Sequence, residues 1–179
     1  TARTLTINTG SGAINLLGNV GAGVNGALGD LTFNSTGTTT LGNGGTTTIA
    51  AASVLTNALG TTALNGSSIT TSGTQTFNDA VTLGANNTLT TTNTAVTFNS
   101  SLDRDATART LTINTGSGAI NLLGNVGAGV NGALGALTFN STGATTLGNA
   151  GTTTIAAASI LTNALGTTAL NGNSITTSG

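Results

Sequence analysis

The 179-residue chain contains no cysteine, proline, histidine, methionine, tryptophan or tyrosine, and four phenylalanines are its whole aromatic content. Without cysteine, the disulfide framework that stabilises many small secreted domains cannot form. A large fold with a continuous core does not need such cross-links. No apolar run approaches the roughly 18 residues of a membrane-spanning helix, so we expect no membrane span in this segment.

Charge is almost as scarce, since only 4% of residues are charged and the formal net charge is −1. Ordinary soluble proteins carry about 25% charged residues. The chain therefore lacks the basic footprint that nucleic-acid binding requires. It does not resemble a disordered protein either, because 37% of its residues are hydrophobic and disorder goes with high charge and low hydrophobicity. We expect it to fold or to aggregate.

The most informative feature is a long internal repeat. Thr1 to Gly73 recurs as Thr107 to Gly179, an offset of 106 residues, and residues 74–106 join the two copies. Such a period is typical of repeat architectures. We interpret 1–179 as one continuous segment of a longer chain, with a first copy at 1–106 and a partial second copy at 107–179. The copies differ at Asp30/Ala136, Thr38/Ala144, Gly44/Ala150, Val54/Ile160 and Ser67/Asn173.

Short runs in which apolar and polar residues alternate predict short strands bounded by Gly or Asn, as in Leu31-Thr32-Phe33 and Ala95-Val96-Thr97-Phe98. The best helical candidate is Ile49 to Leu59, with its run of three alanines. The abundance of Thr, Asn and Gly nevertheless disfavours helix throughout the chain.

Apolar residues also return in three columns about 21 residues apart. The columns are Phe33, Leu55, Phe77, Phe98, Ile120 and Phe139; then Ile7, Leu28, Ile49, Ile69, Leu89 and Ile113; and more loosely Leu41, Leu64, Leu83, Leu102 and Leu122. Three columns predict a three-sided coil, in which each face pairs with the same face of the next turn about 4.8 Å away. The predicted fold class is all-β, a parallel β-helix or β-solenoid with about 21 residues and three short strands per turn, and five turns per repeat.

Asparagine recurs directly after the first column, at Asn34, Asn78, Asn99, Asn121 and Asn140. Asn tolerates the left-handed conformation of a sharp corner, and stacked Asn amides hydrogen-bond along a cross-β stack. We therefore predict an asparagine ladder at one corner of the coil.

The one candidate for catalytic chemistry is the charged cluster Asp103-Arg104-Asp105 with Arg109 nearby. Enzymes that cleave polysaccharides need a close pair of carboxylates, or a carboxylate with a metal and a basic group. The chain offers no His, Glu, Lys or Tyr as a further partner, so a solvated loop is the favoured interpretation. Asp30 is replaced by Ala136 and cannot serve every repeat. The sequence therefore predicts no enzyme, no catalytic residue, no cofactor and no metal site.

Threonine pairs suggest a different kind of site. Thr4 and Thr6, Thr46 and Thr48, Thr88 and Thr90, and Thr110 and Thr112 fall near one phase of the period. Side chains two residues apart on a strand are about 7 Å apart, so stacked pairs would form a flat hydroxyl grid of the kind that binds ice or carbohydrate. The alternative is that Thr is simply a favourable outward strand residue.

Two segments carry a resemblance to a family. They are Gly73-Thr74-Gln75-Thr76-Phe77-Asn78-Asp79-Ala80-Val81-Thr82-Leu83-Gly84-Ala85 and Gly60-Thr61-Thr62-Ala63-Leu64-Asn65-Gly66 with the Ser68-Ile69-Thr70-Thr71-Ser72-Gly73 that follows. Both resemble repeated elements of large bacterial exoproteins of the filamentous-haemagglutinin-like and autotransporter-like type, although Phe77 stands where Tyr is common.

The resemblance implies a right-handed β-helix shaft, export across a Gram-negative outer membrane, and a role in adhesion, aggregation or biofilm. The expected function is thus the structural shaft of an extracellular bacterial fibre or adhesin at the cell surface. Its expected partners are an unknown surface or cell receptor and the chain itself, through head-to-tail or lateral association, because strand edges at the ends of a solenoid can template pairing. Binding of ice or carbohydrate is the alternative function.

Overall fold

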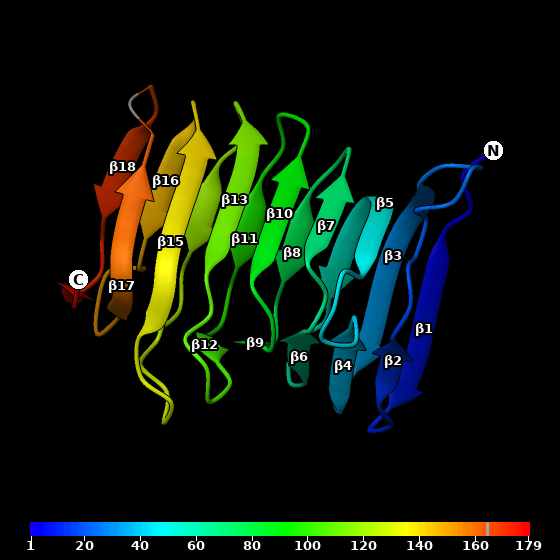
Figure 1. Ribbon diagram of the computed structural model, residues 1–179, viewed down its shortest axis with the longest axis horizontal. Helices are drawn as coiled ribbons and strands as arrows, with labels where there is room; N and C mark the ends of the chain where they lie inside the picture. The colour runs from blue at the N-terminus through cyan, green and yellow to red at the C-terminus, as the bar shows by residue number, and fades with distance from the viewer. Residues whose placement is uncertain (164) are drawn as a thin grey trace.

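In the computed structural model, which describes residues 1–163 and 165–179, every regular element of those residues is a β-strand. All strand pairs are parallel, and the chain winds into a β-solenoid of about seven turns with roughly 23 residues each. Figure 1 shows the strands stacked in rows along one long axis, with the two chain ends at opposite ends of it. The predicted fold class is confirmed, and the turn is slightly longer than the predicted 21 residues.

Each turn contributes to three faces. The first face consists of β1 (Leu5–Gly10), β3 (Leu28–Ser35), the second half of β5 (Thr48–Thr56), β8 (Gln75–Phe77), β11 (Val96–Phe98), β14 (Ile120–Leu122), β16 (Ala144–Leu147) and β18 (Thr167–Leu170). The second face consists of β2 (Ile14–Leu16), β4 (Thr38–Leu41), β6 (Thr61–Leu64), β9 (Ala80–Leu83), β12 (Leu102–Arg104), Val126, the first half of β17 (Thr154–Thr162) and β19 (Ser174–Thr177). The third face consists of Val20, the first half of β5, β7 (Ser68–Thr71), β10 (Asn87–Thr91), β13 (Leu111–Gly116), β15 (Leu134–Ser141) and the second half of β17.

The core is a continuous thread of inward side chains that runs along the solenoid axis. Alternation along each strand sends every second residue inward, as in β10, where Leu89 is fully buried and its neighbours Thr88 and Thr90 are half-buried. Phe77 and Phe98 lie in register and stack with ring centroids 4.8 Å apart and planes 18° apart. Full burial of such a side chain contributes about 1.5–3 kcal/mol, so the core gains stability with every added turn.

The predicted phenylalanine column is only partly correct. Phe77 and Phe98 are neighbours in it, but Leu55 points outward and is 38% exposed. Thr56 takes the inward place between Phe33 and Phe77. The partner of Phe98 in the next turn is Leu122 rather than Ile120. The prediction placed Leu55 where Thr56 lies, an error of one residue in register. Because side chains alternate with a period of two, such an error exchanges an inward residue for an outward one.

Larger parts of the other two predicted columns are confirmed. Ile49, Ile69, Leu89 and Ile113 pair in register on the third face as predicted, and this row continues to Phe139. Leu28 instead pairs with Ala51, and Ile7 with Phe33. Leu41, Leu64 and Leu83 form the predicted row on the second face, where Leu102 pairs with Val81.

The helical alternative for Ile49 to Leu59 is wrong, because residues 48–56 form the long strand β5. This strand pairs with β3 on one side, and with β7 and then β8 on the other. The backbone pairing of both neighbouring turns outweighs the helix propensity of three alanines, which is a weak preference.

The two copies of the repeat do not lie on the same faces. β1 and β13 are equivalent, but β1 is on the first face and β13 on the third. With one strand position per face, the 106-residue repeat covers fourteen positions, which is four and two-thirds turns rather than the predicted five. Each strand of the second copy is therefore displaced by one face from its equivalent in the first.

Candidate functional site

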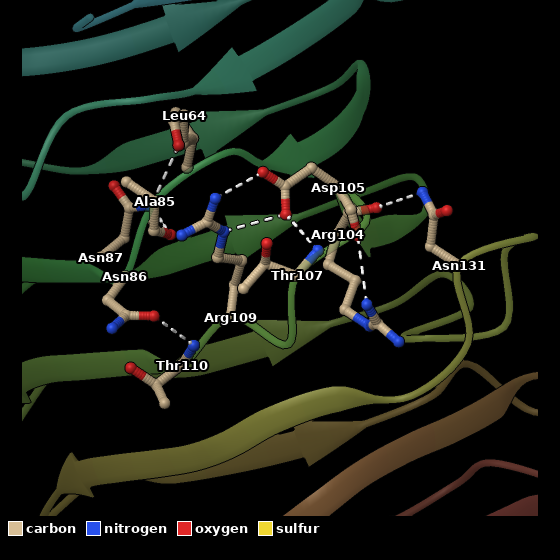
Figure 2. Close-up of polar contacts among 10 residues, drawn as sticks. All are labelled: Leu64, Ala85, Asn86, Asn87, Arg104, Asp105, Thr107, Arg109, Thr110 and Asn131. Carbon is tan, nitrogen blue, oxygen red and sulfur yellow. Dashed lines mark hydrogen bonds and ion pairs between the residues drawn. The ribbon is translucent and has the colours of Figure 1, made fainter. Parts of the chain in front are cut away.

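Asp103 and Arg104 of the charged cluster hold a loop of the next turn. Asp103 Oδ1 accepts a hydrogen bond of 2.8 Å from the Gly129 amide, and Arg104 Nε donates to the Ala133 carbonyl at 2.7 Å. In return, the Asn131 side-chain amide donates to the Arg104 carbonyl at 2.9 Å, as Figure 2 shows. These bonds, with one of 2.9 Å from the Gly127 amide to the Leu102 carbonyl, fasten both ends of residues 127–133 to β12.

Asp105 faces different partners in the corner that follows β12. The Arg109 guanidinium donates two hydrogen bonds to its carboxylate, from Nε to Oδ1 at 2.9 Å and from Nη2 to Oδ2 at 2.6 Å (Figure 2). The Thr107 amide adds a third bond to Oδ1 at 2.9 Å. The Arg109 hydrogen bond is the main reason that the pKa of Asp105 lies below its usual range, with smaller help from Thr107.

The cluster thus has a structural role, and we call Asp103 and Arg104, which hold residues 127–133, the bracket. The two carboxylates that could have shared a substrate are engaged by separate groups, Asp103 by a backbone amide of the next turn and Asp105 by Arg109. The pKa of Asp105 is lowered by Arg109, which is opposite to the raised pKa of a catalytic acid. The residues that the structure describes form no pocket, and they contain no group of three side chains suited to a metal ion.

Asp30 has an equally local role. Its carboxylate accepts a hydrogen bond of 2.7 Å from the Ser53 hydroxyl on the neighbouring turn. In the second copy, Ala136 and Ser159 occupy the same two places, and the strands pair in the same register. The pairing therefore does not depend on this hydrogen bond.

A hydroxyl row runs along the third face, although its members differ from the predicted grid. Five hydroxyl side chains, none of them buried, stack in register on consecutive strands: Thr48, Ser68, Thr88, Thr112 and Thr138. A second rank beside it contains Thr70, Thr90, Asn114 and Asn140. Figure 1 shows β7, β10, β13 and β15 side by side in the row of strands nearest the viewer.

The predicted grid included residues that the fold places elsewhere. Thr6 lies on the first face, where it pairs with Thr32, so it cannot extend the row that contains Thr88. Thr46 precedes β5 and lies outside the strands. The row ends at Leu161, which pairs with Thr138 and is 61% exposed.

The asparagines form pairs and not a single corner ladder. Asn99 donates its side-chain amide to Asn78 at 2.6 Å, Asn34 donates to Asn8 at 2.7 Å, and Asn140 donates to Asn114 at 2.8 Å. The first two pairs lie along the first face and the third lies on the third face. Asn121 bonds instead to the Thr97 hydroxyl at 3.2 Å.

Sequence reasoning missed Asp79, the one carboxylate that is buried among the described residues. It is 2% exposed and accepts hydrogen bonds from the Thr62 hydroxyl at 2.9 Å and the Gly60 amide at 3.1 Å. Burial raises its pKa, and these hydrogen bonds only partly oppose the rise. Its place directly after Phe77-Asn78, where the chain turns from one face to the next, was the available signal.

Sequence reasoning also missed the glycine-rich loop that the bracket holds, residues 127–133, and its equivalent at 21–27. Gly21 and Gly127 each have a positive φ, and a Cβ at either position would strike the carbonyl of Ala50 or Ala156 respectively. At the loop tips, Val24 and Val130 are both 104% exposed. The recurring Gly-Ala-Gly-Val-Asn-Gly-Ala sequence was the signal for a projecting element.

No family model, curated protein or solved structure matches the chain. Within the described residues, no helix is long and apolar enough to cross a membrane.

Proposed function

We propose that this segment is the structural shaft of an extracellular bacterial fibre or adhesin, and that it provides length and rigidity. Its residues form a rod whose backbone hydrogen bonds run along the axis and whose apolar core is continuous. It has no pocket among its described residues, and its charged cluster is used to hold a loop. A rod of this kind separates whatever lies at its two ends.

The observation that carries the proposal is the seam between the two copies. β10 and β11 of the first copy pair in register with β13 and β14 of the second. Leu89 meets Ile113, and Phe98 meets Leu122, and all four side chains are at most 1% exposed. The solenoid therefore passes from one repeat to the next without a break in core or ladder, so that copies add length without a linker.

The extracellular location rests on the resemblance of the repeated elements to those of large bacterial exoproteins. A chain with 4% charged residues and no cysteine also suits export in an unfolded state followed by folding outside the cell. The test is protease added to intact cells that produce the full-length protein. Cleavage within this segment supports the location, and protection until the cells are lysed contradicts it.

Length is tested with tandem arrays of residues 1–106 in one, two and four copies. Electron microscopy should show rods that lengthen by about 22 Å per copy, from four and two-thirds turns of about 4.8 Å. The seam variant Ile113→Asp should break the rods, whereas Thr112→Asp, on the outward side of the same strand, should not. Globular particles whose length does not grow with copy number would contradict the shaft.

A second candidate function is ligand binding by the hydroxyl row of the third face, with carbohydrate or ice as ligand. The supporting observation is that five consecutive strands present a hydroxyl at the same register position. Thr88→Tyr with Thr112→Tyr should abolish binding to a polysaccharide array or the depression of the freezing point. Thr82→Tyr on the second face is the matched control. Equal activity in both variants would remove this candidate.

A further inference from the structure

The displacement of the second copy by one face has a consequence for any chain built from several repeats. We infer that successive repeats are each turned by two-thirds of a revolution, so that the shaft displays the glycine-rich loop on three sides and returns to the same side after three repeats and fourteen turns. The inference rests on the proposed shaft function and adds how the shaft presents its surface.

The evidence is the strand register on both sides of the seam. The loop at 21–27 follows Val20 on the third face and leads to β3 on the first. The equivalent loop at 127–133 follows Val126 on the second face and leads to β15 on the third. The two loops therefore project from different corners of the solenoid, although their sequences are identical.

The local structure that directs the loop is reproduced in both copies. The Val20 amide donates to the Thr48 carbonyl at 3.0 Å, and the Val126 amide donates to the Thr154 carbonyl at 2.8 Å. The turn inside the loop closes with the same bond, Gly26 to Gly23 and Gly132 to Gly129, both at 2.9 Å. Because the contacts repeat while the face changes, the rotation belongs to the repeat length and not to a local distortion.

The bracket explains how the loop keeps its direction. Asp103 and Arg104 come from the end of one repeat and hold the loop of the next. Wherever the repeat follows another copy of itself, the same two residues stand one turn before the loop. Val130 is thus held at the tip of a fastened loop with its side chain fully in solvent, and its direction is set by the solenoid.

The rotation also limits the hydroxyl row. The row that begins at Thr48 crosses the seam and ends on the third face at Thr138, a length of about 19 Å from four strand spacings. The next row begins with Thr154 and Ser174 on the second face. A ligand that binds along one face therefore meets a patch of about this length, and each repeat offers its patch on a new side.

The first test uses spin labels on the 179-residue chain, which has no cysteine of its own. Ser117 lies at the same corner as the loop of Val24, four turns later, so labels at Val24→Cys and Ser117→Cys should lie about 19 Å apart. Labels at Val24→Cys and Val130→Cys should lie at least about 30 Å apart, because a lateral displacement along one side of the solenoid, roughly 20 Å, combines at a right angle with an axial step of about 22 Å. Repeats in phase would reverse this order and place Val24 and Val130 about 24 Å apart, which would overturn the inference.

The second test uses an array of six repeats, with a gold label on a cysteine that replaces the Val24 equivalent of each copy. Electron microscopy should show labels on three sides, with a spacing of about 67 Å along any one side. A single row of labels on a rod that lengthens with copy number would overturn the inference and leave the shaft intact. Correct label distances in the 179-residue chain, with arrays that do not lengthen, would contradict the shaft and leave the rotation intact.

Discussion

Ile7 and Ile113 are the same residue of the repeat, yet they lie on different faces of the solenoid. Ile7 pairs with Phe33 on the first face, whereas Ile113 lies between Leu89 and Phe139 on the third. Ile113 is fully buried and Ile7 is only half-buried, because a turn covers Ile113 on each side. One turn of a solenoid cannot bury its own apolar residues, and stacking completes the core.

This pair gives a matched test of stacking. Ile113→Ala should lower the free energy of unfolding by about 2–5 kcal/mol, the usual cost of such a truncation in a core. Ile7→Ala removes the same atoms from a half-covered site and should cost about 1 kcal/mol or less. Chemical denaturation of both variants measures the difference. Equal losses would mean that the two sites are packed alike.

Phe77 and Thr82 test which residues face inward. Phe77 is 0% exposed and stacked on Phe98, so Phe77→Asp buries an unpaired charge and should cost at least about 3 kcal/mol. Thr82 points to solvent from β9, and Thr82→Asp should change stability by no more than about 0.5 kcal/mol. Thermal unfolding compares them, and a large loss in the Thr82 variant would contradict the assigned register.

The bracket at Asp103 depends on an acceptor oxygen and not on charge. Asp103→Asn keeps an oxygen for the Gly129 amide, whereas Asp103→Ala removes it and should cost about 1 kcal/mol. Hydrogen exchange of residues 127–133 should accelerate in the alanine variant and stay near normal in the asparagine variant. Asp30→Ala is the control, because the second copy already has Ala136 there. Equal exchange in all three variants would mean that the loop does not need the bracket.

The double variant Asp103→Asn with Asp105→Asn separates a structural cluster from a catalytic one. Fibre formation or adhesion should persist, because the acceptor oxygens that hold the loop and the corner remain. The measurement is rod length by microscopy together with an assay of polysaccharide cleavage on parent and variant. A cleavage activity of the parent that disappears in the variant would revive the enzyme hypothesis.

The ionisation of Asp79 should lower the free energy of unfolding as the pH rises. Burial raises its pKa in the folded state, so its contribution is fully present below the unfolded value of about 3.9 and is lost as pH rises through the folded pKa. Asp79→Asn lacks this loss, and its stability relative to the parent should increase from pH 3 to pH 7. Asp105→Asn is the opposite case, because the pKa of Asp105 is lowered and its contribution is present above about 3.9. Denaturation curves across this range check both signs.

The sequence by itself determined the all-β class, the parallel coil and parts of its inward rows. The alternation of apolar and polar residues and the rows of Ile49, Ile69, Leu89 and Ile113 could be predicted because adjacent turns stack like residues. The charged cluster was expected to be a solvated loop whose charges bond locally, which is correct for Asp105 and wrong for Asp103 and Arg104, because these two residues lie in β12 and bond to the next turn. Its role in holding the next turn was not foreseen, since Gly129 is 26 residues from Asp103.

Only the tertiary structure decided which face of the solenoid each residue occupies. Paired residues are 29 apart from Val20 to Ile49 but 20 apart from Ile49 to Ile69. Loops such as 21–27 add residues without turning the chain around the axis, so a mean spacing cannot give the number of turns. For the same reason, the mean spacing wrongly placed Leu55 inside and wrongly put Phe139 in one column with Phe98. Which face a residue occupies is therefore set by pairing with the neighbouring turns, and the sequence of the repeat does not contain that information locally.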